Sequence, residues 1–242
     1  SCMNLAAVAS AGVNALHAAA KTPTEQWGTK MSECSEQAKT KHWLYGVFCG
    51  PCAAAHAKSN VDKSNPCFNF FCFWPAGNYS MVRHHYNIMG DCGPDMAYGW
   101  FCMPCAARQI YTESLIRGSL QGRYGDNTGS WSSELFQCDC SEFAMACFCP
   151  FLVAHDIRTR MHPNSDKCFD CLCTIPFSMY GQVRHTYGIN SEWPHPTCED
   201  FGLGLFFYPC ALNRAQREAA YQLTRAATNQ VTNMAQQKVQ QV

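Results

Sequence analysis

Charged side chains are scarce in this chain, and the two signs balance. Of its 242 residues, 18 are Lys or Arg and 18 are Asp or Glu, so the formal net charge is zero. Without a basic surplus, the composition gives no electrostatic reason to expect nucleic acid as a partner. Long hydrophobic runs are also missing, because the longest candidate, Phe201–Leu212, is shorter than the roughly 18 apolar residues that a membrane-spanning helix needs.

Familiar catalytic and targeting motifs are absent too. The sequence contains no phosphate-binding glycine loop and no His-Glu-x-x-His. Cysteine and histidine abound, yet no local signature marks a Cys–His pair as a nucleophile and its base, so we do not expect an enzyme. The N-terminal stretch has no basic segment of the kind that begins a signal peptide, which favours a cytoplasmic location.

Cysteine is what the chain has in excess. Eighteen of the 242 residues are cysteine, an even number that permits complete pairing without demanding it.

An internal repeat organises these cysteines. Two stretches run from Asp through apolar residues to Pro-Cys-Ala and reach Glu eight residues after the Cys. Two further pairs of blocks match upstream in the same order, which predicts a duplicated module. The matched pairs are Asp95–Glu113 with Asp200–Glu218, Cys72–Ile88 with Cys173–Ile189, and Gly50–His56 with Cys149–His155.

The predicted fold is mainly α, with two tandem small cysteine-rich helical modules, irregular loops and a long C-terminal helix. The pattern Tyr79, Val82 and Tyr86 follows one helix face, and the second copy repeats it. The predicted division is an Ala-rich arm (1–25), module A (26–117), a Gly- and Ser-rich linker (118–130), module B (131–221) and a polar helical tail (222–242).

Proline and glycine predict where the last helix of each copy bends or stops. Pro104 and Pro209 fall inside the expected helices, where each removes a hydrogen bond, so we expect a kink at both positions. Gly118 is a plausible helix end in copy A. Copy B lacks such a stop, and its helix is expected to continue to the end of the chain.

At Cys149-Pro150-Phe151, Val82–Ile88 and Asp95–Glu113 the chain resembles the placenta-specific gene 8 cysteine-rich family, which includes cornifelin and the plant cell-number regulators. The resemblance covers nearly all of both copies. The chain departs from the family's Cys-Pro-Cys block in both copies, and Phe207 replaces the first Cys of the terminal Cys-x-x-Cys in copy B. The resemblance implies links to cell-size control, heavy-metal resistance, calcium entry or membrane association, and it implies no catalytic residue.

The cysteines allow several chemistries. One hypothesis is a structural zinc site in each copy, because zinc prefers four thiolate or imidazole ligands in a tetrahedron. Buried thiols that act as small hydrophobic groups and S-acylation of exposed cysteines are alternatives. The candidate zinc ligands are Cys49, Cys52, Cys67, Cys72, Cys102, Cys105 and His56 in copy A, with Cys168, Cys173, Cys210 and His155 in copy B.

A disulfide between Cys52 and Cys102 is the other hypothesis. In the alignment above, Phe151 and Phe207 occupy these positions in copy B. A joint replacement of this kind is what two contacting residues would show.

The two copies share few charged residues, and these suggest an ion pair within each copy. We expect the ion pairs Arg83–Asp95 and Arg184–Asp200, since a guanidinium meets a carboxylate through two parallel hydrogen bonds. Glu113 recurs as Glu218 in the second copy.

These patterns predict a non-catalytic, cysteine-rich structural or interaction protein in a cytoskeletal, filamentous or membrane-associated assembly. Protein partners would contact the N-terminal arm and the C-terminal helix. The alternative is a membrane-peripheral protein of heavy-metal or calcium homeostasis, held by S-acylation. No cofactor is certain, and zinc is the one that the cysteines suggest.

Overall fold

The computed structural model describes residues 25–29, 40–119, 129–137, 140–162, 165, 170 and 175–240. The mainly α fold is confirmed, because these residues form helices and contain no β-strand. The predicted arm and most of the predicted linker lie outside this part of the chain, as do the zinc candidates Cys168 and Cys173.

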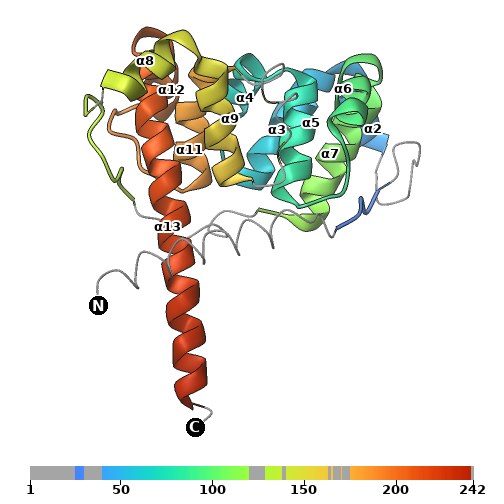
Figure 1. Ribbon diagram of the computed structural model, residues 1–242. Coiled ribbons are helices and arrows are strands. Elements are labelled where there is room, and N and C mark those ends of the chain that lie inside the picture. The colour runs from blue at the N-terminus through green and yellow to red at the C-terminus, as the bar shows by residue number, and fades with distance from the viewer. Residues whose placement is uncertain are drawn as a thin grey trace.

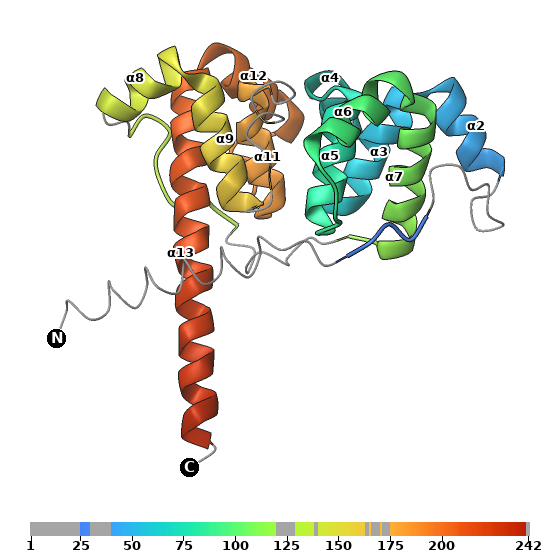
Figure 2. The same ribbon diagram turned by 45° about the vertical axis from the view of Figure 1, so that its right-hand side comes forward.

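The described residues form two groups of helices that lie side by side (Figures 1 and 2). We call residues 25–119 the first half and residues 129–240 the second half. The first half contains α2 (Thr40–Phe48), α3 (Gly50–Asp62), α4 (Pro66–Cys72), α5 (Pro75–His85), α6 (Cys92–Phe101) and α7 (Met103–Arg117). The second half contains α8 (Cys140–Phe148), α9 (Pro150–Met161), the 3₁₀-helix η1 (Pro176–Ser178), α11 (Met179–Thr186), α12 (Pro196–Phe206) and α13 (Tyr208–Gln240).

Proline begins most of these helices. It occupies the first or second position of α3, α4, α5, α7, α9 and α12, where its fixed φ suits the helix and its missing N–H is not needed. The predicted kink at Pro104 and Pro209 is therefore wrong. The chain leaves the helix at Cys102 and Phe207, and a new helix starts directly afterwards with the proline in its first turn.

The predicted ends of the final helices are confirmed. Helix α7 stops at Arg117, and Gly118 follows with φ 72°, a backbone conformation that glycine adopts without strain. Helix α13 has no such stop and continues for 33 residues. Its C-terminal part extends well beyond both groups of helices (Figure 1).

Each half has its own apolar core. Residues of the predicted helix face, including Val82 and Val183, are fully buried in these cores. The positions that α3 and α9 contribute show the true register between the halves: Ala53, Ala54, Ala57 and Val61 in α3, and Val153, Ala154, Ile157 and Met161 in α9.

This register corrects the alignment of the upstream block by one residue. The residues before the two helices, Cys49 and Cys149, have nearly the same backbone angles. Cys52 therefore corresponds to Leu152, not to Phe151. Phenylalanine therefore replaces Cys102 in the second half, at Phe207, but does not replace Cys52.

In each half, a buried glutamate of the final helix accepts hydrogen bonds from the segment that precedes the first helix of that half. Glu113 accepts hydrogen bonds from Gly28 N and Thr29 Oγ1, both at 3.0 Å. Glu218 accepts from Ser132 N at 2.7 Å and from Ser132 Oγ at 2.6 Å. Both glutamates are fully buried, so these hydrogen bonds compensate for the lost hydration of each carboxylate.

Close helix contacts also recur. A Cβ placed on Gly99 of α6 would lie 2.3 Å from Ala76 Cα, and one on Gly204 of α12 would lie 2.2 Å from the carbonyl oxygen of Phe177. Glycine is therefore required at both positions for α6 and α12 to approach the preceding elements.

We predict that Gly99→Ala lowers the free energy of unfolding by about 1–3 kcal/mol, because the new methyl group overlaps the backbone of α5. Gly93→Ala in the same helix is the matched control, since a Cβ there meets nothing within 4 Å. We expect that control to be neutral or stabilising by up to about 1 kcal/mol. Urea denaturation measures both; equal effects of the two substitutions would contradict the predicted close contact.

Candidate functional site

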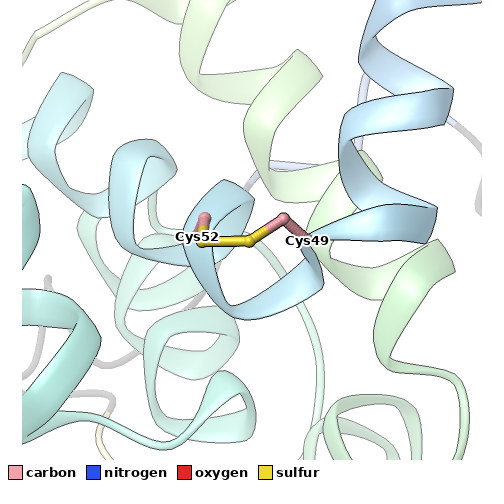
Figure 3. The surroundings of a disulfide bond; sticks show 2 residues. All are labelled: Cys49 and Cys52. Carbon is pink, nitrogen blue, oxygen red and sulfur yellow. A yellow bond between two sulfur atoms is a disulfide. The ribbon is translucent and has the colours of Figure 1, made fainter.

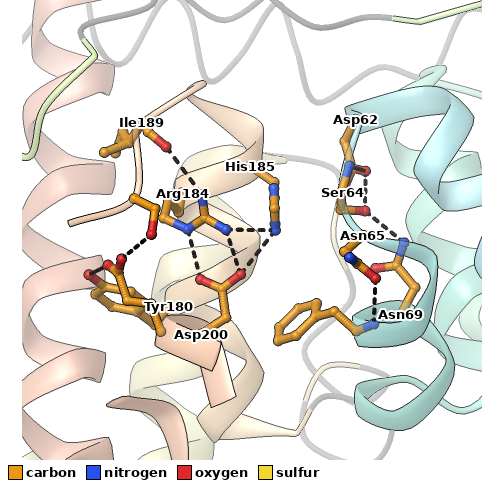
Figure 4. A network of polar contacts seen from close by, with 12 residues as sticks. Asp62, Ser64, Asn65, Asn69, Tyr180, Arg184, His185, Ile189 and Asp200 are labelled. Atoms are coloured by element: carbon orange, nitrogen blue, oxygen red, sulfur yellow. Dashed lines mark hydrogen bonds and ion pairs between the residues drawn. The ribbon is translucent and has the colours of Figure 1, made fainter. Parts of the chain in front are cut away.

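Both ion pairs expected from the sequence are present. Arg83 Nε lies 3.0 and 2.8 Å from the two carboxylate oxygens of Asp95. Arg184 donates from Nε and Nη2 to the two oxygens of Asp200 at 2.8 and 2.6 Å (Figure 4). Each arginine also donates to the carbonyl of Ile88 or Ile189, at 3.2 and 3.3 Å.

These contacts are structural, because each arginine joins three segments of its half. All four charged side chains are buried. Burial alone would raise the pKa of Asp200, but hydrogen bonds from Arg184 and His185 outweigh that effect and lower it. The carboxylate therefore stays ionised and paired at neutral pH.

A cluster of buried charged and imidazole groups lies between the two halves. Lys58 Nζ donates to Asp62 Oδ2 at 2.6 Å, and Arg158 Nε lies 2.7 Å from Asp170 Oδ1. Each of these cations thus has a carboxylate beside it, which offsets part of the cost of burying a charge. The cluster consists of Lys58, Asp62, His84, His85, Arg158, His162 and Asp170, each at most 4% exposed.

Side chains of this cluster cross from one half to the other. Arg158 of α9 donates from Nη1 to Met81 Sδ at 2.6 Å, and its Nη2 lies 3.1 Å from His84 Nδ1. The rings of His85 and His162 meet edge to face, with centroids 4.4 Å apart. The two halves are therefore joined partly through polar groups that water does not reach.

Phe68 of α4 supplies the apolar part of the same interface. It is fully buried, with its ring centroid 5.4 Å from that of Phe201 and 6.0 Å from that of His185. A Cβ on Gly181 would come within 2.5 Å of the Phe68 ring, so this glycine makes room for the phenylalanine.

The three histidines of the cluster are held neutral. Burial is the largest cause, and it lowers the pKa of His85 to about 4 although Asp62 acts in the opposite direction. Burial also lowers the pKa of His84 and His162 well below the usual value, and Arg158 lowers both further.

The structure places the candidate cysteines differently from the predicted disulfide. Cys52 is joined to Cys49 by a disulfide (Figure 3). The predicted pair Cys52–Cys102 is therefore wrong, and Cys102 is exposed at the break between α6 and α7.

The zinc candidates do not form a ligand set in the described part of the chain. Cys49 and Cys52 are oxidised, and burial raises the pKa of Cys72 to about 12, which disfavours the thiolate that zinc requires. Among the described residues, no three His, Cys, Asp or Glu side chains gather in a way that could hold a metal ion.

The remaining zinc candidates are placed as follows. Cys67 is exposed, while Cys105 and Cys210 are half-buried at the first turns of α7 and α13. His56 is exposed, with its ring 5.8 Å from that of Tyr45. His155 Nδ1 lies 2.9 Å from Asp170 Oδ2.

The most exposed large side chains form a feature that the sequence patterns above did not predict. Four phenylalanines are more than 80% exposed, and each is the last residue of a helix before a break: Phe48 of α2, Phe101 of α6, Phe148 of α8 and Phe206 of α12. The sequence carries a usable signal, since each phenylalanine precedes by two or three residues the proline of the next helix. We call these four residues the junction phenylalanines.

Each half has two breaks, the points where one helix ends and the next begins directly afterwards, and these two breaks lie next to each other. In the first half, Gly50 at the start of α3 lies against Met103 at the start of α7. In the second half, Tyr208 Oη lies 3.3 Å from the carbonyl oxygen of Cys147. All four breaks lie at the upper end of the molecule in Figures 1 and 2, away from the free end of α13.

More aromatic and apolar surface accompanies the junction phenylalanines. Trp74 and Trp100 are about half exposed, with ring centroids 5.0 Å apart, and Trp100 directly precedes Phe101. Phe71 is 69% exposed on neighbouring α4. A solvent-facing group of this kind is a candidate binding surface, since most monomeric proteins expose no large apolar patch.

Comparisons with protein-family models, curated proteins and solved structures find no match to this chain. The resemblance to the placenta-specific gene 8 family therefore stays a prediction from its motifs. Within the described residues, no single helix is long and apolar enough to cross a bilayer. Helices α8 and α9 have the required length and apolarity only when taken together, and the chain bends by 107° between them.

The buried histidines predict a loss of stability in mild acid. A histidine that is neutral when folded but protonated when unfolded favours unfolding as the pH falls below about 6.5. For His85 this loss continues to about pH 4 and amounts to about 2 kcal/mol between pH 7 and pH 5.

Urea denaturation across this pH range, compared with that of His85→Gln, measures the effect. The variant should lose about 2 kcal/mol less than the wild type over the same interval, whatever its stability at pH 7. Parallel pH profiles for the two proteins would show that His85 is not held neutral.

Proposed function

We propose that the protein is a non-catalytic structural or interaction protein built from two tandem cysteine-rich modules. Recurring contacts support the duplication: the Arg–Asp pair, the buried glutamate and the close-approach glycine each occur once in either half. The junction phenylalanines are the observation that carries the function, because they too occur in pairs in both halves.

The chemistry of the junction phenylalanines favours binding over catalysis. Removing a phenylalanine side chain from water contributes about 1.5–3 kcal/mol, so several rings at one end of the molecule supply substantial affinity. The ionisable groups of the cluster between the halves are buried, where a substrate in solution does not reach them. We propose that the partner belongs to a large cytoplasmic assembly, of cytoskeletal or filamentous kind.

A membrane-peripheral protein is the second candidate, and the exposed position of Cys102 favours it. Cys102 directly follows Phe101 and is exposed, so a thioester-linked acyl chain there would enter a bilayer beside the phenylalanine rings. In this case the same surface would face lipid. A role in heavy-metal or calcium homeostasis, and zinc as a ligand, remain predictions from the sequence.

We predict that serine at Phe48, Phe101, Phe148 and Phe206 together releases the protein from large particles in sedimented cell lysates, raising the soluble fraction more than tenfold. Ile116→Ser is the control, because Ile116 is 55% exposed but lies in the last turn of α7, away from the breaks. We expect it to sediment like the wild type; release of neither variant would contradict the proposed surface.

Alkaline carbonate washing separates the two candidates. A protein of a non-membrane assembly should carry no thioester-linked lipid by mass spectrometry and should not depend on membranes to sediment. An acylated membrane protein should remain with membranes until hydroxylamine cleaves the thioester, and Cys102→Ser should reduce that retention.

A further inference from the structure

The Cys49–Cys52 disulfide lies at the N-terminus of a helix. Cys49 is the N-cap residue of α3, and Gly50, Pro51 and Cys52 form its first turn. Both cysteines are half-buried, so the disulfide is neither sealed in the core nor fully exposed. A Cys-x-x-Cys pair in this position has the features of a reactive dithiol, because a helix N-terminus favours the thiolate form of cysteine.

An apolar cleft opens beside Cys52. Its volume is about 160 Å³, and its lining includes Cys52, His56, Cys67, Phe70 and Phe71. The two phenylalanines are 42% and 69% exposed, so the cleft has an accessible wall of aromatic rings. Cys49 does not line the cleft, so a group that enters the cleft reaches Cys52 and not Cys49.

The two sulfurs are suited to different roles in thiol–disulfide exchange. Attack on a disulfide is fastest when the departing thiol is the more acidic one. Cys49 at the N-cap of a 13-residue helix is near the positive end of the helix dipole, which stabilises a departing thiolate there. Cys52 is thus the sulfur that is reached, and Cys49 is the sulfur that leaves.

We propose that Cys49–Cys52 is a thiol–disulfide exchange site for a polypeptide cysteine flanked by apolar side chains. The incoming thiol transfers its proton to the imidazole of His56, one helical turn after Cys52. The thiolate attacks Cys52 Sγ, a new S–S bond forms, and the Cys49–Cys52 bond breaks with its electron pair leaving on Cys49. The site's own disulfide is the oxidant, and attack of Cys49 on the mixed disulfide reverses the step.

The second half provides an internal comparison. Cys149 occupies the same N-cap position before α9, but Leu152 and Asp156 stand at the positions of Cys52 and His56. The second half therefore has neither the disulfide nor the imidazole. The exchange site is confined to the first half and does not depend on the proposed function of the junction phenylalanines.

The test uses the oxidised full-length protein and a reduced peptide with Cys between Phe and Leu. Reaction in native buffer is stopped with an alkylating reagent, and peptide mapping by mass spectrometry locates each modification. We expect the peptide on Cys52 and the alkyl group on Cys49. A disulfide that opens only in denaturant, or a peptide attached to Cys49 instead, would overturn the proposal.

Reduced glutathione and a peptide with Cys between Asp and Lys test the source of the thiol. We expect the apolar peptide to react at least tenfold faster than either. Phe71→Ser should remove this advantage by slowing the reaction of the apolar peptide, because Phe71 forms part of the aromatic wall of the cleft. Equal rates for all three thiols would overturn the assignment of an apolar polypeptide.

Discussion

Proline determines where a new helix begins at four breaks of this chain, and the exposed ends of the preceding helices follow from that constraint. A proline cannot lie in a helix interior without breaking a hydrogen bond, but it fits the first turn. At the breaks before α3, α7, α9 and α13 the chain therefore leaves one helix and starts another. The residue that ends the first helix has no neighbouring turn to pack against, and in all four cases it is an exposed phenylalanine.

Two pairs of positions that are equivalent in register lie at the interface between the halves, and only one of these pairs differs in charge. Lys58 in α3 corresponds to Arg158 in α9, and Asp62 corresponds to His162. All four side chains are buried at the interface, where the cations lie beside Asp62 and Asp170. An aspartate in place of His162 would add a third buried carboxylate to Asp62 and Asp170, so the neutral imidazole keeps the buried cations and carboxylates of the cluster equal in number.

The sequence was sufficient for features that depend on local pattern or on repetition. Helix content, the end of α7 at Gly118 and the two Arg–Asp pairs all followed from spacing and recurrence. The Cys49–Cys52 disulfide was not predicted. The alignment of that block is displaced by one residue, so it matched Cys52 with Phe151 instead of Leu152 and favoured a disulfide with Cys102. The interface between the halves could not be predicted either, since an internal repeat does not show which faces of the two copies contact each other.

The two halves share the exposed phenylalanines but not the disulfide. Both have an exposed phenylalanine at each break, an arrangement that fits the proposed contact with a partner at this end of the molecule. Only the first half pairs the N-cap cysteine with a second cysteine in the same turn. A disulfide in one half, next to a surface formed by both, would let the redox state of a partner cysteine add a covalent bond to an apolar contact. Binding and exchange are then separable, since loss of Cys52 would leave the phenylalanines of both halves in place.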